Sequence, residues 1–205
     1  MKKLICSVIL LLGFICSHAQ TKASLFHNPG IYTTFEMREN EPVKAIPQVW
    51  VYLKKFYIES RYNYDDLHSF SLYFGRAFSL SKKATAEMTP MIGGVIGRTK
   101  GISPALNFYY EYQKFQSTTQ SQYTIVMPNG SGSFFYDWTN FSYTVYKKVG
   151  LGGSIQFTIP KTGSATATYG PLLNIRIKDF LLEGYAYNFW KDDRLWALAI
   201  QYSIK

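Results

Sequence analysis

The chain has 205 residues and a formal net charge of +9. Its mean hydropathy is −0.10, and 17% of its residues are charged, against ~25% in typical soluble domains. Aromatic residues make up 18% of the chain, which excludes a disordered protein because disordered chains are poor in aromatics. The near-neutral hydropathy excludes a bundle of membrane-spanning helices, and the length fits a single domain.

Residues 1–20 read MKKLICSVILLLGFICSHAQ and have the features of a secretory signal peptide. Lys2 and Lys3 precede an apolar run of 13 residues, Leu4 to Cys16, which is too short to span a bilayer. We predict a signal peptide at 1–19, cleaved after Ala19. The mature chain then has no cysteine, and its charge falls from +9 to +7 because Lys2 and Lys3 leave. No disulfide, Cys-ligated metal or thiol nucleophile is therefore expected.

Beyond a periplasmic N-terminal segment at 20–28, apolar and polar residues alternate in successive segments, which is the period of a half-buried strand. The clearest segment runs from Val149 to Ile159, where Leu151, Ile155 and Phe157 alternate with Gly, Ser, Gln and Thr. Helical spacing fits none of these segments. The segment 120–127 is the weakest, and it is kept because bacterial barrels have an even number of strands. We predict about twelve strands, with ten as the alternative: 29–38, 47–54, 55–65, 68–80, 84–98, 102–115, 120–127, 133–147, 149–159, 167–178, 179–190 and 194–205.

Three features favour a membrane barrel over a soluble sandwich or a lipocalin-like protein. The polar strand faces carry few charges, and the interior of a twelve-stranded barrel is too wide for side chains to fill in a soluble protein. Aromatic residues also gather near strand ends, as in the girdles of membrane barrels. We predict an all-β fold, a transmembrane up-and-down antiparallel β-barrel over 29–205 in the cell outer membrane. The girdle residues would be Trp50, Tyr52, Tyr62, Tyr64, Trp138, Trp190 and Trp196.

Lysines occur in four of the five connections that a periplasmic C-terminus assigns to the periplasmic side. These connections are Lys54-Lys55, Ser81 to Lys83, residues 116–119, Lys147-Lys148 and Lys178-Asp179. The lysines are either ordinary solvated turn residues or a rim that faces anionic headgroups or a periplasmic partner. The rim would consist of Lys54, Lys55, Lys82, Lys83, Lys147 and Lys148.

Charged residues on the polar faces are expected to line the lumen. They form either a charged constriction that selects solutes or a salt-bridged plug. We expect an open lumen, because the polar faces of 133–147 and 149–159 offer mostly small groups. An arginine should accordingly be tolerated at Ser154 but not at lipid-facing Ile155. The candidate lumen residues are Glu36, Arg38, Glu59, Arg61, Glu111, Arg176 and Lys178.

No motif indicates catalysis. In the mature chain, His68-Ser69 is the only adjacent His–Ser pair that could suggest a lipid hydrolase, and Asp65, Asp66 and His68 lack further ligands for a divalent cation. There is no phosphate-binding loop and no zinc-ligand spacing. We expect no catalytic residue, no cofactor, no metal and no nucleic-acid partner.

Several segments carry a resemblance to known proteins: Glu59–Asp66, Thr89–Gly97, Gly101–Pro104 and Phe134–Trp138, together with Gln20 after the cleavage site. In these segments the chain resembles a group of uncharacterised small outer-membrane β-barrel proteins of Bacteroidetes-type bacteria. The resemblance extends over nearly all of the mature chain. It implies the fold and the compartment, and it assigns no activity and no functional residue.

The expected function is therefore a porin-like, passive pore for small hydrophilic solutes. The alternative is a structural or accessory subunit of an envelope complex with a plugged lumen, and the minor alternative is a lipid-modifying outer-membrane enzyme. The expected partners are outer-membrane lipids, with other envelope proteins as the alternative.

Overall fold

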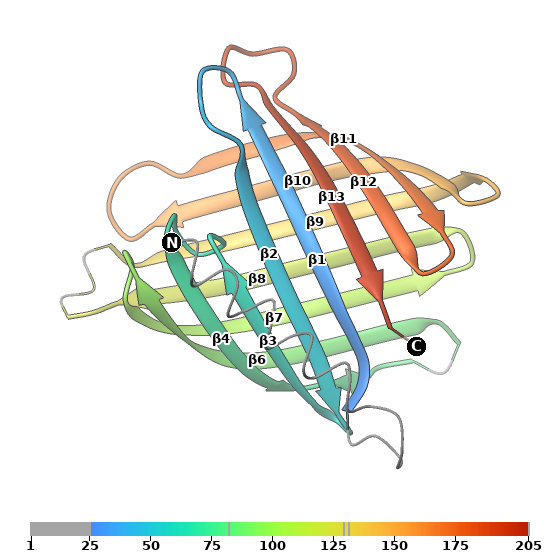
Figure 1. The fold of residues 1–205 in the computed structure, drawn as a ribbon, viewed down its shortest axis with the longest axis horizontal. Coiled ribbons are helices and arrows are strands. Elements are labelled where there is room, and N and C mark those ends of the chain that lie inside the picture. The colour runs from blue at the N-terminus through green and yellow to red at the C-terminus, as the bar shows by residue number, and fades with distance from the viewer. Residues whose placement is uncertain (1–25, 82, 129, 131, 205) are drawn as a thin grey trace, which may run out of the picture.

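A computed structural model describes residues 26–204 apart from 82, 129 and 131, and the predicted signal peptide lies outside these residues. Each strand pairs antiparallel with the next one along the chain, except that β4 and β5 both pair with β6. β1 (Phe26–Arg38) pairs with β13 (Leu195–Ser203), which closes the sheet into a barrel. Figure 1 shows β1, β2 and β13 in front crossing β8, β9 and β10 behind, as tilted strands do in a closed barrel.

The structure confirms the predicted number of strands. β4 and β5 occupy one position in the wall and are separated by Ala77, whose N–H donates to the Lys55 carbonyl oxygen, so the wall has twelve strands. The remaining strands are β2 (Lys44–Leu53), β3 (Phe56–Tyr62), β4 (Ser69–Arg76), β5 (Phe78–Ser79), β6 (Thr85–Gly97), β7 (Gly101–Tyr112), β8 (Phe115–Val126), β9 (Phe134–Tyr146), β10 (Val149–Pro160), β11 (Thr166–Ile177) and β12 (Phe180–Tyr187).

Most predicted boundaries lie within a few residues of the observed ones, and two differ in an informative way. β1 begins at Phe26 rather than at residue 29. β8 begins at Phe115, so the predicted turn at 116–119 is wrong, and the turn lies at Gln113-Lys114. The sequence Gln116-Ser117-Thr118-Thr119 is polar on both faces, so it carries no alternation that could reveal a strand.

The wall has polar residues inside and apolar residues outside. Ser71, Ser103 and Thr124 are fully buried in the barrel, while outward Leu72 and Ile96 are 52% and 63% exposed. Soluble monomers rarely expose contiguous apolar patches of more than a few hundred Å². The outer wall is therefore suited to lipid rather than to water.

No described residue belongs to a helix that is long and apolar enough to cross a membrane.

The two ends of the barrel differ. At the tight-turn end, strands are joined by two-residue turns at Lys54-Lys55, Gln113-Lys114, Lys147-Lys148 and Lys178-Asp179. The first residue of each turn is left-handed, with φ of 58°, 54°, 43° and 53° respectively. β1 begins and β13 ends at this end. The loop end carries the connections 39–43, 63–68, 98–100, 127–133, 161–165 and 188–194.

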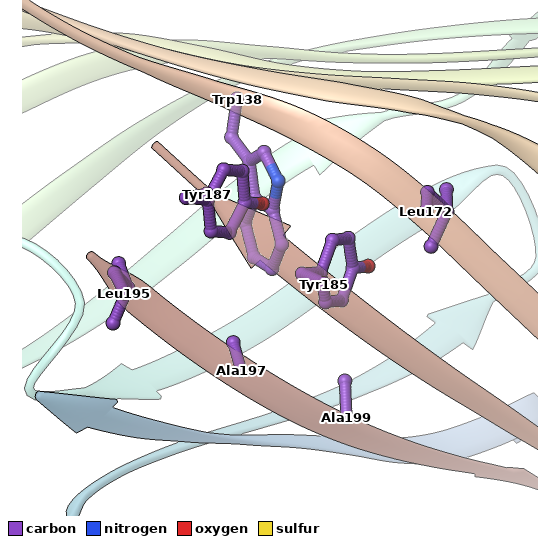
Figure 2. Close-up of a cluster of buried hydrophobic side chains, with 7 residues drawn as sticks. All are labelled: Trp138, Leu172, Tyr185, Tyr187, Leu195, Ala197 and Ala199. Atoms are coloured by element: carbon purple, nitrogen blue, oxygen red, sulfur yellow. The ribbon is translucent and has the colours of Figure 1, made fainter. Parts of the chain in front are cut away.

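Large rings from β9 and β12 fill one side of the lumen. Figure 2 shows Trp138, Tyr185 and Tyr187 together with Leu172 and Leu195. The indole N–H of Trp138 donates to the Ser154 hydroxyl at 3.0 Å, and that hydroxyl lies 2.6 Å from the Tyr187 hydroxyl. The small residues of β10 therefore make room for rings from β9 and β12. The expectation of an open lumen beside Ser154 is wrong, because Ser154 is only 2% exposed.

Candidate functional site in the barrel lumen

The middle of the lumen is crossed by a cluster of polar side chains that we call the waist: Glu59, Arg61, Asp65, Tyr73 and Gln122. Glu59 and Arg61 lie two residues apart on β3, so both point inward, and each is 1% exposed. Tyr73 comes from β4 and Gln122 from β8. The loop 63–68 contributes Asp65.

Arg61 is held on every side. Its Nε donates to Glu59 Oε1 at 2.7 Å, and its terminal nitrogens donate to Gln122 Oε1 at 2.7 Å and to Asn107 Oδ1 at 3.3 Å. The guanidinium carbon lies 4.4 Å from the ring centre of Tyr64 and 4.5 Å from that of Tyr73. Charge-assisted hydrogen bonds are short and strong, so this geometry holds the cation firmly in the lumen.

Gln122 links the Arg61 cation to the Asp65 carboxylate. Its Oε1 accepts from Arg61, and its Nε2 donates to Asp65 Oδ1 at 2.6 Å. The Tyr73 hydroxyl donates to the same carboxylate oxygen at 2.9 Å. The waist therefore contains one cation and two carboxylates. Glu59 contacts Arg61 directly, and the Gln122 amide connects Arg61 to Asp65.

The loop 63–68 folds into the lumen because of its own hydrogen bonds. Asn63 and His68 are both left-handed, with φ of 58° and 59°. Asn63 Oδ1 accepts the His68 N–H at 2.7 Å, and Asn63 Nδ2 donates to the Ala45 carbonyl oxygen at 3.0 Å. This inward fold brings Tyr64 and Asp65 to the waist.

Two cavities formed by the described residues flank the waist. The loop-end vestibule has a volume of about 470 Å³, and its charged lining residues are Glu36, Arg38, Lys44, Asp65 and Asp66. The turn-end vestibule has a volume of about 590 Å³, and its lining includes Trp50, Tyr52, Glu87, Arg176 and Glu183. Trp138 lines both vestibules. The vestibules thus open at opposite ends of the barrel and approach each other at its middle.

The predicted lumen charges are distributed over all three levels of the lumen. Glu59 and Arg61 lie in the waist, Glu36 and Arg38 in the loop-end vestibule, and Arg176 in the turn-end vestibule. Exposed Glu111 lies on β7 towards the tight-turn end and accepts a hydrogen bond from the Tyr109 hydroxyl.

The seventh predicted lumen residue is misplaced. Lys178 is not in the lumen wall, because β11 ends at Ile177 and Lys178 is the exposed first residue of the following turn.

The predicted aromatic girdle needs correction at four positions. Tyr62, Trp190 and Trp196 are exposed, at 39%, 50% and 52%. The other four point into the lumen: Trp50, Tyr52, Tyr64 and Trp138. The Trp50 ring packs so closely on Gly30 that an added Cβ would lie 2.2 Å from a ring atom. Three of these four lie on inward strand faces, and Tyr64 lies in the loop that folds into the lumen. An aromatic side chain near a strand end therefore does not by itself indicate an outer girdle.

The rim lysines lie where the turns were expected. Lys54, Lys55, Lys83, Lys147 and Lys148 are exposed at the tight-turn end, and Lys82 lies outside the described residues. Because the turn lies at Gln113-Lys114 rather than at 116–119, the rim also includes the exposed Lys114. Its Nζ lies 6.0 Å from the Tyr143 ring centre.

The residues considered for catalysis or metal binding do not gather. His68 is exposed, and Asp65 points into the waist. Asp66 instead pairs with Arg98 at 3.5 Å and accepts from the Thr99 hydroxyl at 2.9 Å. Among the described residues, no group of three His, Cys, Asp or Glu side chains is placed to hold a metal ion.

Sequence reasoning missed Tyr64, Asp65, Tyr73 and Gln122 as parts of the site. Alternation places Tyr73 and Gln122 on inward faces, but it carries no signal that they meet Arg61 across the lumen. Asp65 lies at the end of the predicted strand 55–65, whereas β3 ends at Tyr62, and nothing in the sequence shows that the following loop folds inward.

Comparisons with known proteins bear on the fold. No family model matches the chain, and no curated protein matches it. Among solved structures, the KdgM porin is similar with a TM-score of 0.60 and 12% identity, over 86% of this chain and 99% of that one. The KdgM porin in complex with disordered oligogalacturonate gives a TM-score of 0.58 and 10% identity, over 86% and 99% of the two chains. The chain therefore has the barrel fold of these porins.

Proposed function

We propose that the protein is an outer-membrane channel for small hydrophilic solutes. The observation that carries the proposal is an apolar outer wall around two vestibules with charged lining residues, which approach each other at a charged waist. The porin fold supports it. The cleaved signal peptide, the periplasmic rim, the kinship with Bacteroidetes-type barrels and the absence of enzymatic activity are parts of the same proposal.

The charge pattern favours small neutral or zwitterionic solutes. One neighbour was solved with oligogalacturonate, which is a polyanion. Here, however, the loop-end vestibule mixes Arg38 and Lys44 with Glu36, Asp65 and Asp66, and Lys44 lies 3.7 Å from Glu36. A lining with both signs selects weakly for the sign of a solute, so size at the waist should dominate selection.

Passage through the waist requires side chains to move. Tyr64 covers Arg61 from the loop side, and its hydroxyl donates to Gln120 Oε1 at 2.8 Å. We therefore expect a small conductance in the wild-type protein and a larger one in Tyr64→Ala, which removes this cover. Tyr62→Ala is the matched control, because Tyr62 points outward.

The test is single-channel recording in planar bilayers, combined with swelling of liposomes in small sugars and amino acids. Small conductance steps in the wild type, enlarged by Tyr64→Ala and unchanged by Tyr62→Ala, would support a channel. A wild type that neither conducts nor admits solutes, while Tyr64→Ala does both, would overturn it.

That second result would favour the other candidate, a structural subunit with a plugged lumen. The observation in its favour is the complete burial of the Glu59–Arg61 ion pair in the waist.

A further inference from the structure

The outer wall carries a polar island in the middle of an apolar surface. The island consists of Ser117, Thr119 and Ser121 on β8 and of Asp137 and Thr139 on β9. Residues of one strand with the same parity share a face, and the exposed Tyr123 and Phe141 place these five on the outside. The pairs Ser121–Asp137 and Thr119–Thr139 are neighbours in the β8–β9 ladder, so the island is contiguous.

Apolar residues enclose the island on all sides. Along the two strands it is bounded by Phe115, Tyr123, Phe135 and Phe141. On the neighbouring strands it is bounded by Leu106 and Phe108 of β7 and by Ile155 and Phe157 of β10. The island is therefore not the polar margin of the apolar belt. This enclosure also keeps it away from lipid headgroups.

Hydrogen bonds within the island use every hydroxyl proton. Ser121 donates to Asp137 Oδ1, and Thr139 donates to Asp137 Oδ2 at 2.9 Å. Because the Thr139 proton is committed, Thr119 is the donor in its 3.0 Å contact with Thr139. Ser117 donates to the Asn140 carbonyl oxygen at 3.1 Å.

The Asp137 carboxylate keeps unused acceptor capacity. Two carboxylate oxygens offer about four acceptor sites, and the island fills two of them. Among the described residues, neither Lys nor Arg forms an ion pair with Asp137. The island therefore presents a negative charge and acceptors, with no hydroxyl proton left to donate.

We propose that the polar island docks a membrane-embedded segment of another protein that carries a Lys or Arg side chain. A charge inside the apolar layer is costly unless it is paired, and a basic side chain supplies both the opposite charge and the missing donors. A second copy that presents its own island does not fit. It carries the same negative charge, and its hydroxyl protons are already donated in hydrogen bonds.

The test uses the full-length mature protein, reconstituted in phosphatidylcholine vesicles, and two synthetic transmembrane peptides. Both peptides are Leu–Ala helices of about 20 residues, one with a central Lys and one with Leu at that position. Energy transfer from a dye at Asp192→Cys, at an exposed position of the 188–194 loop, to a labelled peptide measures binding.

We expect the Lys peptide to bind at least about tenfold more tightly than the Leu peptide. Asp137→Asn should remove this preference, and Glu39→Gln should keep it, because Glu39 is an exposed loop acid. Thr119→Ile should also remove the preference, because the larger apolar side chain covers the island while Asp137 itself is unchanged. This variant tests the proposal if Asp137→Asn fails to fold.

Equal affinity for the two peptides would overturn the proposal, as would a Lys preference that survives both island variants. Self-association of the wild type in vesicles, abolished by Asp137→Asn, would also overturn it and would identify a second copy as the occupant.

Discussion

Arg61 combines a full charge with complete burial, and its partners explain how both are tolerated. Glu59 neutralises it, Gln122 and Asn107 accept hydrogen bonds from its two terminal nitrogens, and two tyrosine rings cover its faces. Such a pair costs most when only one member is removed, because the other charge stays buried.

We expect Arg61→Met to lower the free energy of unfolding by ~3–5 kcal/mol, because it leaves the Glu59 carboxylate without its cation. The double variant Glu59→Leu/Arg61→Met removes both charges and should recover most of the loss. Urea titration of the reconstituted barrel, followed by tryptophan fluorescence, measures both. Equal losses in the single and double variants would show that packing of the Arg61 stem, rather than its charge, stabilises the waist.

Arg176 is the opposite case, because it is exposed in the turn-end vestibule. Arg176→Glu changes the vestibule charge by two units without touching the waist, so the barrel should fold normally. If the protein conducts, its ion selectivity should move towards cations, as a reversal potential in a salt gradient will show. An unchanged reversal potential would place selectivity in the waist instead.

At the scale of strands, β10 shows how one element separates two environments. Its outward residues Leu151 and Phe157 are 52% and 37% exposed, whereas inward Ser154 is 2% exposed and packed against Trp138 and Tyr187. Arginine at Ser154 would displace these rings, contrary to the expectation from sequence. Thr158, further along the same face, lines the open loop-end vestibule.

Ile155→Arg and Thr158→Arg, both made in the Asp137→Asn background, therefore form a matched pair. This background removes the acid that lies diagonally across the β9–β10 ladder from Ile155 and could pair with the new cation. The first places a charge on the lipid face, which costs ~2–4 kcal/mol near the bilayer midplane. The second places it in a wet cavity and should change stability little. Folding yield and urea stability in lipid vesicles test the pair, and equal damage from both would mean that the Thr158 side of the lumen is closed.

Alternation along the strands predicted their number and their faces, including the inward positions of Glu59 and Arg61. It could not predict the waist, because a period of two assigns a face but says nothing about which residues meet across a lumen. The girdle errors had a usable signal: Trp50 and Tyr52 share the parity of Gln48, and Trp138 shares that of Asn140 and Ser142. The predicted strand 120–127 begins five residues later than β8. The outward residues Ser117 and Thr119 belong to the polar island, so this part of the strand shows no alternation of apolar and polar residues.

For the whole molecule, we expect a mature chain that begins at Gln20 and fractionates with the outer membrane. Unheated, it should migrate differently on denaturing gels, because a closed barrel resists the detergent until heating. N-terminal sequencing of the mature protein and heat-dependent gel mobility provide the measurement. Recovery of the protein as a soluble periplasmic monomer would contradict the membrane fold.

The seam between β1 and β13 makes completion of the wall depend on the end of the chain. Nine residue pairs join these strands, and Tyr32 of β1 also donates to Glu183 of β12 at 2.9 Å. A truncated product lacking β13 would keep two open edges with unpaired backbone groups, which lipid cannot satisfy. Closure of the wall, and with it stable insertion, therefore requires a chain that is synthesised through β13.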